Sequence, residues 1–315
     1  MRIVLFASPG IIGPYVFMAL LQKKMDVVLL VTPPNHPYGA PADLQIIARQ
    51  QKIHLISPSD LNDSGFYQVM HETKPDIIFV ATFDKLIPKK ICDCAKLGAV
   101  NIHPSLLPKY RGACPEFWAI KKGEKETGVS IHYLSDEFDT GRVIAQKKVM
   151  IGEKDTVGVL SYTLAQTAAA LASEVIDGFA ADGDLKGIEQ NDINASKAPL
   201  VTADDLKINW EDTRENIYNL VRAANPVSAA WTMFRGFHMK VWHVEKLVGT
   251  QESDFNHEIC GSAGGMLLLP GSQSVLARCS DGFLILKVVQ PALYYIMDAW
   301  NFAKMTSVKN GEVLG

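Results

Sequence analysis

The sequence predicts an α/β protein in two parts, a mostly parallel sheet covered by helices and then a small β-barrel domain. Short β-branched runs alternate with helical patterns through residues 2–150, and these strands are apolar throughout. Beyond residue 208, short strands are divided by glycines, which is typical of a small barrel or sandwich. A chain of 315 residues is long enough for two domains.

Strands and helices follow each other in the first part as they do in repeated βαβ units. Strands are expected at 2–8, 26–32, 53–56, 76–81, 98–103, 127–134 and 143–150. Helices are expected at 14–23, 42–51, 66–73, 115–122 and 156–181.

A polar stretch at 183–203, with Gly, Asn, Asp, Ser and Pro, separates the two parts. We expect a first domain at 1–190, a linker at 191–207 and a C-terminal open β-barrel domain at 208–315. The second domain begins with a helix at 214–224, and its strands are expected at 230–234, 238–246, 266–269, 274–279 and 283–289. The sequence leaves open whether 249–265 folds over the pocket or lies on the surface. The aromatic-rich segment 294–302 is expected, by default, to belong to the core.

The composition is ordinary for a globular protein, with 48% hydrophobic and 21% charged residues and a formal net charge of −3. That charge gives no reason to expect nucleic acid as a partner. No apolar run is long enough to span a membrane or to form a signal peptide, so we expect a cytoplasmic protein. Five scattered cysteines fit reduced thiols and predict no metal site.

Asn101, His103 and Asp139 are the candidate catalytic residues. Asn101 and His103 end an apolar strand, where a spacing of two residues points both side chains to one face. Asp139 lies in a turn before Gly141. These are the groups that acyl transfer between nitrogens needs: donors for the developing oxyanion and an acceptor for the proton of the attacking amine. A carboxylate beside His103 should also keep that imidazole protonated.

Other candidates have weaker support in the sequence. The remaining histidines, His132 among them, lack such neighbours. Gly10 and Gly13 do not complete a dinucleotide-binding pattern, so a tight turn is preferred. Ser105 lacks the flanking glycines of a nucleophile elbow, and Cys114 shows no sign of activation beyond nearby Arg111.

Several motifs together resemble the 10-formyltetrahydrofolate-dependent formyltransferases. They run through Asn101-x-His-Pro-Ser-Leu-Leu-Pro-x-Tyr-Arg-Gly112, Trp118-Ala-Ile-x-x-Gly123, Thr127-Gly-Val129 and Asp139-Thr-Gly141. Beyond them, Lys207-Ile-Asn-Trp210, Arg222-Ala-Ala-Asn-Pro226 and Lys240-Val-Trp242 are similar to the C-terminal domain of methionyl-tRNA formyltransferases. The resemblance implies a Rossmann-like catalytic domain joined to a small open β-barrel.

The resemblance also implies roles for particular residues. Asn101, His103 and Asp139 become the catalytic set, with 10-formyltetrahydrofolate as co-substrate and no metal. Folate contacts are expected from Phe83, Leu86, Ile87, Ser135, Asp136 and Glu137. A substrate loop is expected from Ser105, Leu106, Leu107, Pro108, Arg111 and Gly112, with a cis peptide bond at Leu107–Pro108.

The sequence leaves the formyl acceptor open among methionyl-tRNA, an amino sugar and an N-hydroxy amino acid, and the oligomeric state is also open. Residues 32–42 contain no Lys or Arg, and 208–315 carry nine Lys and Arg against ten Asp and Glu, so charge supports tRNA binding weakly. Two alternative functions remain: a 10-formyltetrahydrofolate hydrolase, and a folate-binding protein without turnover.

Overall fold

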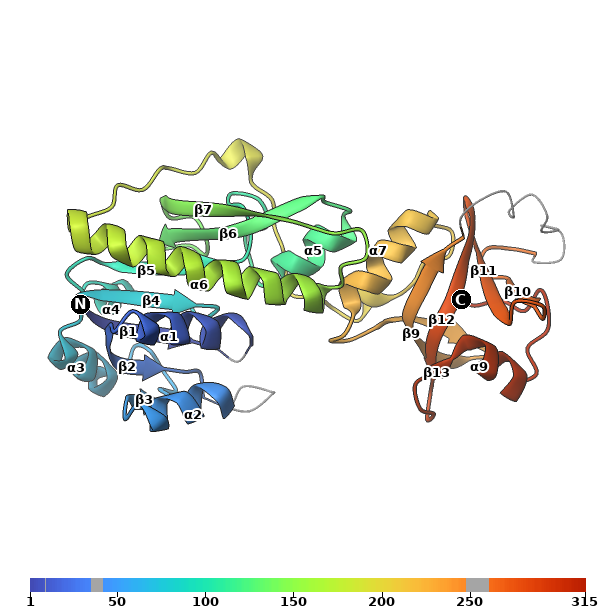
Figure 1. Cartoon of the computed structure of the whole chain (residues 1–315), viewed down its shortest axis with the longest axis horizontal. Coiled ribbons are helices and arrows are strands. Elements are labelled where there is room, and N and C mark those ends of the chain that lie inside the picture. Colours follow the sequence, from blue (N-terminus) through green and yellow to red (C-terminus); the bar gives the residue numbers. More distant parts are fainter. Residues whose placement is uncertain (9, 35–41, 248–260) are drawn as a thin grey trace. The chain divides into compact units, whose positions relative to one another are not determined.

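The computed structural model describes residues 1–8, 10–34, 42–247 and 261–315 (Figure 1). The chain divides into two compact units. The first comprises Met1–Glu116, Glu126–Ile151 and Leu160–Leu200, and the second comprises Phe117–Lys125, Gly152–Val159 and Val201–Gly315. Most of the segment 249–265, whose place the sequence left open, lies outside the described residues, as do residues 35–41 of the loop without Lys or Arg.

A seven-stranded sheet forms the centre of the first unit, in the order β3-β2-β1-β4-β5-β6-β7. Its strands are β1 (Arg2–Ala7), β2 (Asp26–Val31), β3 (His54–Ile56), β4 (Ile77–Ala81), β5 (Ala99–His103), β6 (Glu126–Tyr133) and β7 (Val143–Met150). The first five in sequence pair in parallel, whereas β6 and β7 run antiparallel. The predicted mostly parallel α/β fold is confirmed.

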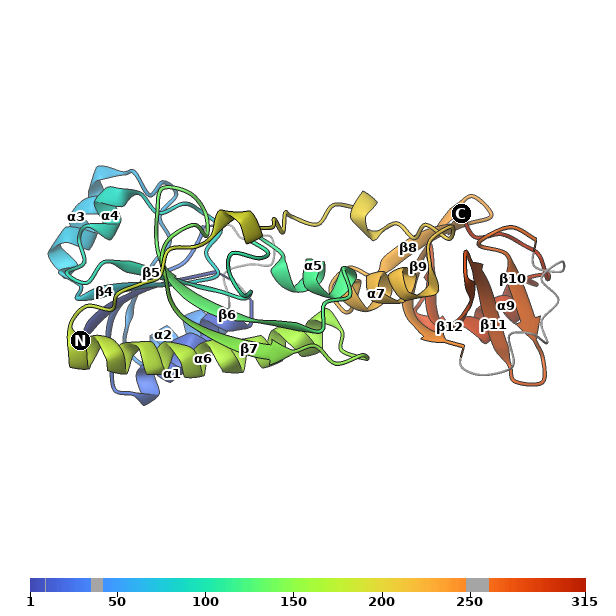
Figure 2. The same ribbon diagram turned by 90° about the horizontal axis from the view of Figure 1, so that it is seen from above.

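Helices cover both faces of this sheet, as the apolar strands require. Figure 2 shows α1, α2 and α6 on one face and α3 and α4 on the other. The helices are α1 (Ile12–Gln22), α2 (Ala42–Gln50), α3 (Ser64–Thr73), α4 (Lys89–Cys92), α5 (Pro115–Lys121) and α6 (Val157–Asp182). Every residue of β4 is buried, and Phe6 packs edge-on against Phe66 and Phe83 beside it.

Among the described helices, α6 alone is long and apolar enough to cross a membrane by those two measures. Nine of its residues are nevertheless buried in the protein, at the spacing of a helix that packs along one side. They are Leu160, Leu164, Ala165, Ala168, Leu171, Ala172, Val175, Ile176 and Phe179. The apolar character of α6 is therefore explained by core packing.

An antiparallel sheet forms the second unit, in the order β10-β11-β12-β9-β8, with β13 paired to β12. Its elements are α7 (Arg214–Ala224), β8 (Ala230–Phe234), β9 (Phe237–Lys246), β10 (Met266–Leu269), β11 (Ser274–Cys279), β12 (Gly282–Pro291), β13 (Met297–Asp298) and α9 (Ala299–Met305). Single bridges join Gly265 to Val313 and Phe234 to Leu314, so the C-terminal residues connect the two ends of the sheet. A sheet tied in this way is curled as the predicted open barrel requires.

The aromatic segment near the C-terminus departs from the default prediction of a core position. Phe302 is buried, but Leu293, Tyr294 and Tyr295 are exposed by 105%, 52% and 88%. The segment leaves β12 as a turn, with Leu293 at a φ of 67°, before β13 and α9 begin. The short elements β13 and α9 were not expected from the sequence, and the four-residue helix α4 was not expected either.

A buried hydrogen bond in the second unit gives a test of its packing. The indole N–H of Trp210 donates to Oγ1 of Thr232 at 3.0 Å, and both residues are buried. Thr232→Val keeps the shape but leaves the indole N–H without an acceptor, so we expect the free energy of unfolding in urea to fall by about 1–3 kcal/mol. Thr232→Ser, which keeps the hydroxyl, is the control. Equal losses in both variants would contradict a role for this bond.

Candidate active site

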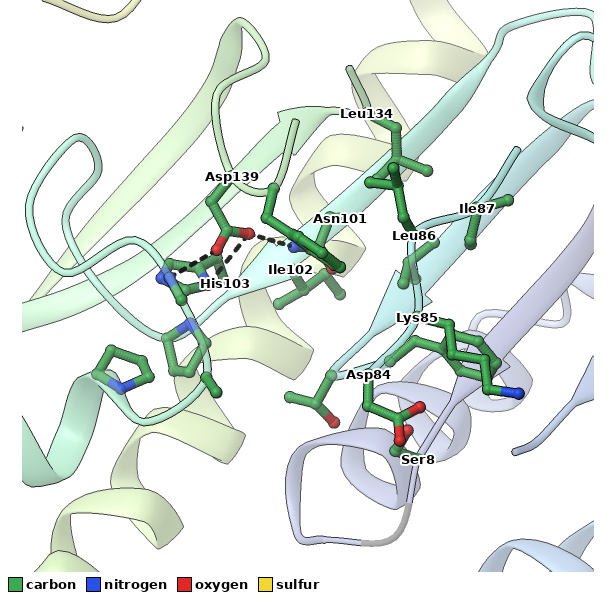
Figure 3. A pocket seen from close by; sticks show the side chains of 18 of the residues that line it. Ser8, Asp84, Lys85, Leu86, Ile87, Asn101, Ile102, His103, Leu134 and Asp139 are labelled. Carbon is green, nitrogen blue, oxygen red and sulfur yellow. Dashed lines mark hydrogen bonds and ion pairs between the residues drawn. The ribbon is translucent and has the colours of Figure 1, made fainter. Parts of the chain in front are cut away.

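A cavity of about 500 Å³ opens at the carboxyl ends of β1, β4 and β5 (Figure 3). Strand β2, which follows β1 in the sequence, pairs with one edge of β1, and β4 pairs with the other edge. The strand order therefore reverses between β1 and β4, and open α/β sheets bind ligands at such a point. Ser8 follows β1, Thr82 follows β4, and His103 ends β5, and all three line the cavity.

The antiparallel pairing of β5 and β6 positions the first polar side chains. Asn101 pairs with His132, and His103 pairs with Ser130. Because side chains two residues apart on a strand share a face, Asn101 and His103 both face the cavity, as the sequence predicted. The same pairing brings the ring of His132 to Asn101, whose Nδ2 lies 3.1 Å from His132 Nε2.

Asp139 is fixed by the turn that follows β6. Its φ is 59°, and the next glycine, Gly141, packs so tightly that a Cβ there would lie 1.8 Å from the carbonyl oxygen of Tyr133. The side-chain amide of Gln190 donates to the carbonyl oxygens of Asp139 and Gly141 at 2.8 and 2.7 Å. The backbone N–H of Gly112 donates to Asp139 Oδ2 at 2.8 Å. The carboxylate is therefore held in place from two separate loops.

The structure brings the three predicted catalytic side chains together. Asn101 Nδ2 donates to Asp139 Oδ1 at 3.2 Å, and His103 Nδ1 lies 3.5 Å from the same oxygen. Figure 3 shows Asp139 joined to both residues above the cavity. His103 and Asp139 are 4% and 8% exposed, so this cluster is shielded from bulk water on most sides.

The surroundings of His103 act on its protonation in opposite directions. Its Nε2 lies 2.9 Å from the carbonyl oxygen of Tyr110, so Nε2 carries a proton and donates. Burial lowers the pKa of His103, whereas the charge of Asp139 and the Tyr110 contact both raise it. The sequence predicted the effect of the carboxylate, which favours an imidazolium, but not the opposing cost of burying that charge.

Asp139 stays ionised. Burial by itself raises its pKa, but the neighbouring rings of His132 and His103 and the Gly112 N–H together hold the pKa below its usual value. The hydrogen bonds from Gly112 and Asn101 stabilise the Asp139 carboxylate whether or not the histidines are protonated. The cavity therefore contains a buried carboxylate that is ready to accept a proton.

His132 was wrongly set aside in the sequence. It is 1% exposed, its Nε2 lies 3.5 Å from Asp139 Oδ1, and its Nδ1 donates to the Tyr133 carbonyl oxygen at 2.8 Å. Its Nε2 is then the acceptor for one Asn101 N–H. The pairing of the expected strands at 98–103 and 127–134 would have placed it beside Asn101. Gln190 carried no comparable signal.

The residues expected to bind folate divide between two cavities. Phe83, Leu86, Ile87 and Glu137 line the cavity with the catalytic cluster. Ser135 and Asp136 line a neighbouring one, which also includes Leu86 and Ile87.

The predicted substrate loop is mainly a support for the site. Of its side chains and backbone, only Gly112 lines the cavity. The peptide bond at Leu107–Pro108 is cis, as the resemblance implied. Ser105 Oγ donates to the Lys109 carbonyl oxygen at 2.6 Å, and Arg111 contacts Gln190 and Asp192. Leu106 packs so closely on Gly128 that a Cβ there would lie 2.5 Å from its side chain.

Glu116 also lines the cavity, and the sequence did not single it out. It lies in the first turn of α5, where partial burial raises the pKa of its carboxyl group to about 7. The opposing cause is its own backbone N–H. Within the described ranges, no group of three or more His, Cys, Asp and Glu side chains is arranged to hold a metal.

A partly buried amide, a buried imidazole and a buried carboxylate in one cavity are the groups that an acyl-transfer enzyme needs. The sequence matches the family model described as "Formyl transferase" over residues 1–176 and that described as "Formyl transferase, C-terminal domain" over residues 200–307. The chain belongs to the formyl transferase family, and it is a formyltransferase.

Relatives match over the full length. Methionyl-tRNA formyltransferase from Bacillus velezensis is 32% identical over 100% of this chain and 98% of that protein. The protein of the same name from Acetivibrio thermocellus is 32% identical over 100% of both chains.

Two solved structures share the fold. An N-formyltransferase from Helicobacter canadensis, in complex with folinic acid and dTDP-3-aminofucose, has a TM-score of 0.67 at 21% identity over 92% of this chain and 100% of that one. HypX from Aquifex aeolicus, in complex with tetrahydrofolic acid, has a TM-score of 0.63 at 19% identity over 96% of this chain. The chain spans 47% of HypX, about half its length.

The raised pKa of Glu116 predicts how Glu116→Gln changes stability with pH. The folded state keeps this proton to about pH 7, whereas the unfolded carboxyl loses it near 4.5. Folding therefore costs more free energy as pH rises through this window. We expect Glu116→Gln to be more stable than the wild type at pH 8 by about 1–3 kcal/mol, and nearly equal at pH 5, in urea unfolding. A gain of equal size at both pH values would rule out titration of Glu116 as its cause.

Proposed function

We propose that this formyltransferase takes its one-carbon unit from 10-formyltetrahydrofolate and passes it to a primary amine at the cluster of Asn101, His103 and Asp139. The observation that carries the proposal is the arrangement of that cluster: an ionised carboxylate with an imidazole and an amide, each within 3.5 Å of it, at the wall of a cavity. Residues 1–190 would form the catalytic domain, with 191–207 linking it to the C-terminal domain at 208–315.

The cavity suits a flat, reduced pterin. Its volume of about 500 Å³ is in the range of small-molecule pockets. Apolar side chains at the ends of β4 and β6 supply one wall, where Phe83, Leu86, Ile87 and Leu134 line it. When bound there, 10-formyltetrahydrofolate supplies a formamide carbon that is open to attack by nitrogen.

Asn101 would stabilise the charge that develops on the formyl oxygen. Attack by the amine forms a C–N bond and moves the carbonyl electrons onto oxygen. One N–H of Asn101 already bonds His132, and the other bonds Asp139 Oδ1 at 3.2 Å. Asn101 also lines the cavity, so its amide group is within the space where the developing oxyanion would accept a hydrogen bond.

His103 and Asp139 would hold the proton that the attacking nitrogen loses. With a proton on Nε2, His103 presents Nδ1 to Oδ1 of Asp139 at 3.5 Å, and in the neutral imidazole Nδ1 is an acceptor. A proton between them is attracted by both, and the imidazolium that forms is stabilised by the carboxylate. The same proton then passes to the departing folate nitrogen as its C–N bond breaks, so one N–H is lost and one is gained.

For the acceptor, methionyl-tRNA is the first candidate. Relatives with that name match both parts of this chain at 30–32% identity. A small-molecule amine is the second candidate, because residues 208–315 have a net charge of −1 and residues 32–42 have no Lys or Arg. Binding to phosphates depends on neutralising cations, and neither stretch has an excess of them. We propose a cytoplasmic location, where either acceptor would be found.

Release of tetrahydrofolate from 10-formyltetrahydrofolate separates the candidate functions. The enzyme is incubated alone, with methionyl-tRNA, and with dTDP-3-aminofucose. We expect release only with an acceptor. Release without any amine would favour a hydrolase, and no release with any amine would favour a folate-binding protein.

Asn101→Ala tests the oxyanion donor. We expect turnover to fall by about 10²–10³-fold, with little change in the binding of 5-formyltetrahydrofolate. Asp139→Asn should fall at least as far, because it removes both the proton acceptor and the charge that favours an imidazolium. The control is Asn62→Ala, on an exposed side chain. Near-normal turnover in either site variant would refute the assigned role.

A further inference from the structure

Two polar groups in the cavity have no part in the formyl-transfer steps described above. Ser8 follows β1, beside the end of β4, where Ala7 pairs with Ala81. Ser8 is 5% exposed, and its Oγ makes no hydrogen bond with any residue in the described part of the chain. Figure 3 shows it apart from Asp139, toward the β1 side of the cavity. An enclosed hydroxyl without a partner is costly unless a ligand supplies one.

The second group is the carboxyl of Glu116. Apart from its own backbone N–H, no hydrogen bond or ion pair is found for it across residues 1–8, 10–34, 42–247 and 261–315. Glu116 lies four residues after Gly112, whose N–H holds Asp139. The segment between them also lines the cavity through Ala113 and Pro115, so both carboxyl groups border the same space.

Lys85 lines the cavity but does not neutralise Glu116. Its ammonium donates to the carbonyl oxygen of Ser59 at 3.2 Å instead. A partly buried carboxylate without a cation is unfavourable by itself, and it is the group that an ammonium ion would stabilise. The pterin wall of Phe83 and Leu86 is apolar and offers no such partner.

We propose that Glu116 binds the primary ammonium group of the acceptor in this cavity. This inference rests on the proposed function. It assigns the acceptor a positively charged amino group, as in an aminoacyl ester or an amino sugar. Ser8 lies on the β1 side, near Asp84 and Lys85, so its hydroxyl is left to a hydrogen-bonding atom elsewhere on a bound molecule.

Glu116 would also prepare the amine for attack. An ammonium ion has no lone pair, so it must first give one proton to a base. The carboxylate of Glu116 accepts that proton, which leaves a neutral amine and a neutral carboxylic acid. The neutral amine then attacks, and its second proton goes to His103 and Asp139. The pKa of Glu116 is about 7, close to that of an α-amino group, about 7.7–8.0, so the transfer is nearly balanced.

Steady-state kinetics of Glu116→Gln test the inference, with 10-formyltetrahydrofolate as donor and with methionyl-tRNA and dTDP-3-aminofucose as the two acceptor probes. We expect kcat/KM for the accepted probe to fall by about 10–100-fold, the loss of a charge-assisted hydrogen bond. The KM for the donor should change less than about twofold, and binding of 5-formyltetrahydrofolate should be retained. The control is Glu72→Gln, which removes the same charge from an exposed position on α3.

The pH profile gives a readout that a merely structural role would not move. In the wild type, kcat/KM for the acceptor should fall below pH 7 as Glu116 takes up a proton, and Glu116→Gln should lose that part of the profile. The other titratable groups that line the cavity are Asp84, Lys85, His103, Glu137 and Asp139.

The outcomes separate the inference from the function on which it rests. Formylation by the wild type, with an unchanged acceptor kcat/KM in Glu116→Gln, would overturn the acceptor site alone. A wild type that formylates neither probe would remove the proposed acceptor class, and the acceptor site with it. A loss confined to the acceptor side would support the proposal.

Discussion

The site depends on keeping one buried carboxylate charged. Asp139 is 8% exposed, and a carboxylate in that position would take up a proton if its surroundings were apolar. Hydrogen bonds donated by Gly112 and Asn101 stabilise the ionised form, and the neighbouring rings of His103 and His132 also lower the pKa. The tight turn at Gly141 then aims the charge into the cavity. Nearly every other feature of the site follows from this constraint.

The cavity combines groups from strands that are distant in sequence. The reversal of strand order between β1 and β4 opens the space, and β5 and β6 bring the amide and imidazoles to it. Apolar side chains after β4 give the pterin side its character, whereas Glu116 at the start of α5 gives the cavity a carboxyl group from a different segment. One fold can thus keep its donor chemistry while the acceptor changes, because different loops supply the two ends.

Much of this architecture could be predicted from the sequence, and the exceptions have physical causes. Alternating apolar strands fixed the sheet, and a spacing of two residues placed Asn101 and His103 on one face. His132 was missed because its partner lies across a strand pair whose register a local pattern does not give. The burial of His103, which lowers its pKa, cannot be read from neighbours in sequence. Glu116 gave no signal, since an acidic residue in the first turn of a helix is common.

The most direct test of the central claim is a crystal structure of the enzyme with 5-formyltetrahydrofolate. The account predicts the pterin against Phe83 and Leu86, with the formyl oxygen within about 3 Å of Asn101 Nδ2 and the formyl carbon beside the pair of His103 and Asp139. A pterin bound outside this cavity, or a formyl group out of reach of all three side chains, would contradict it.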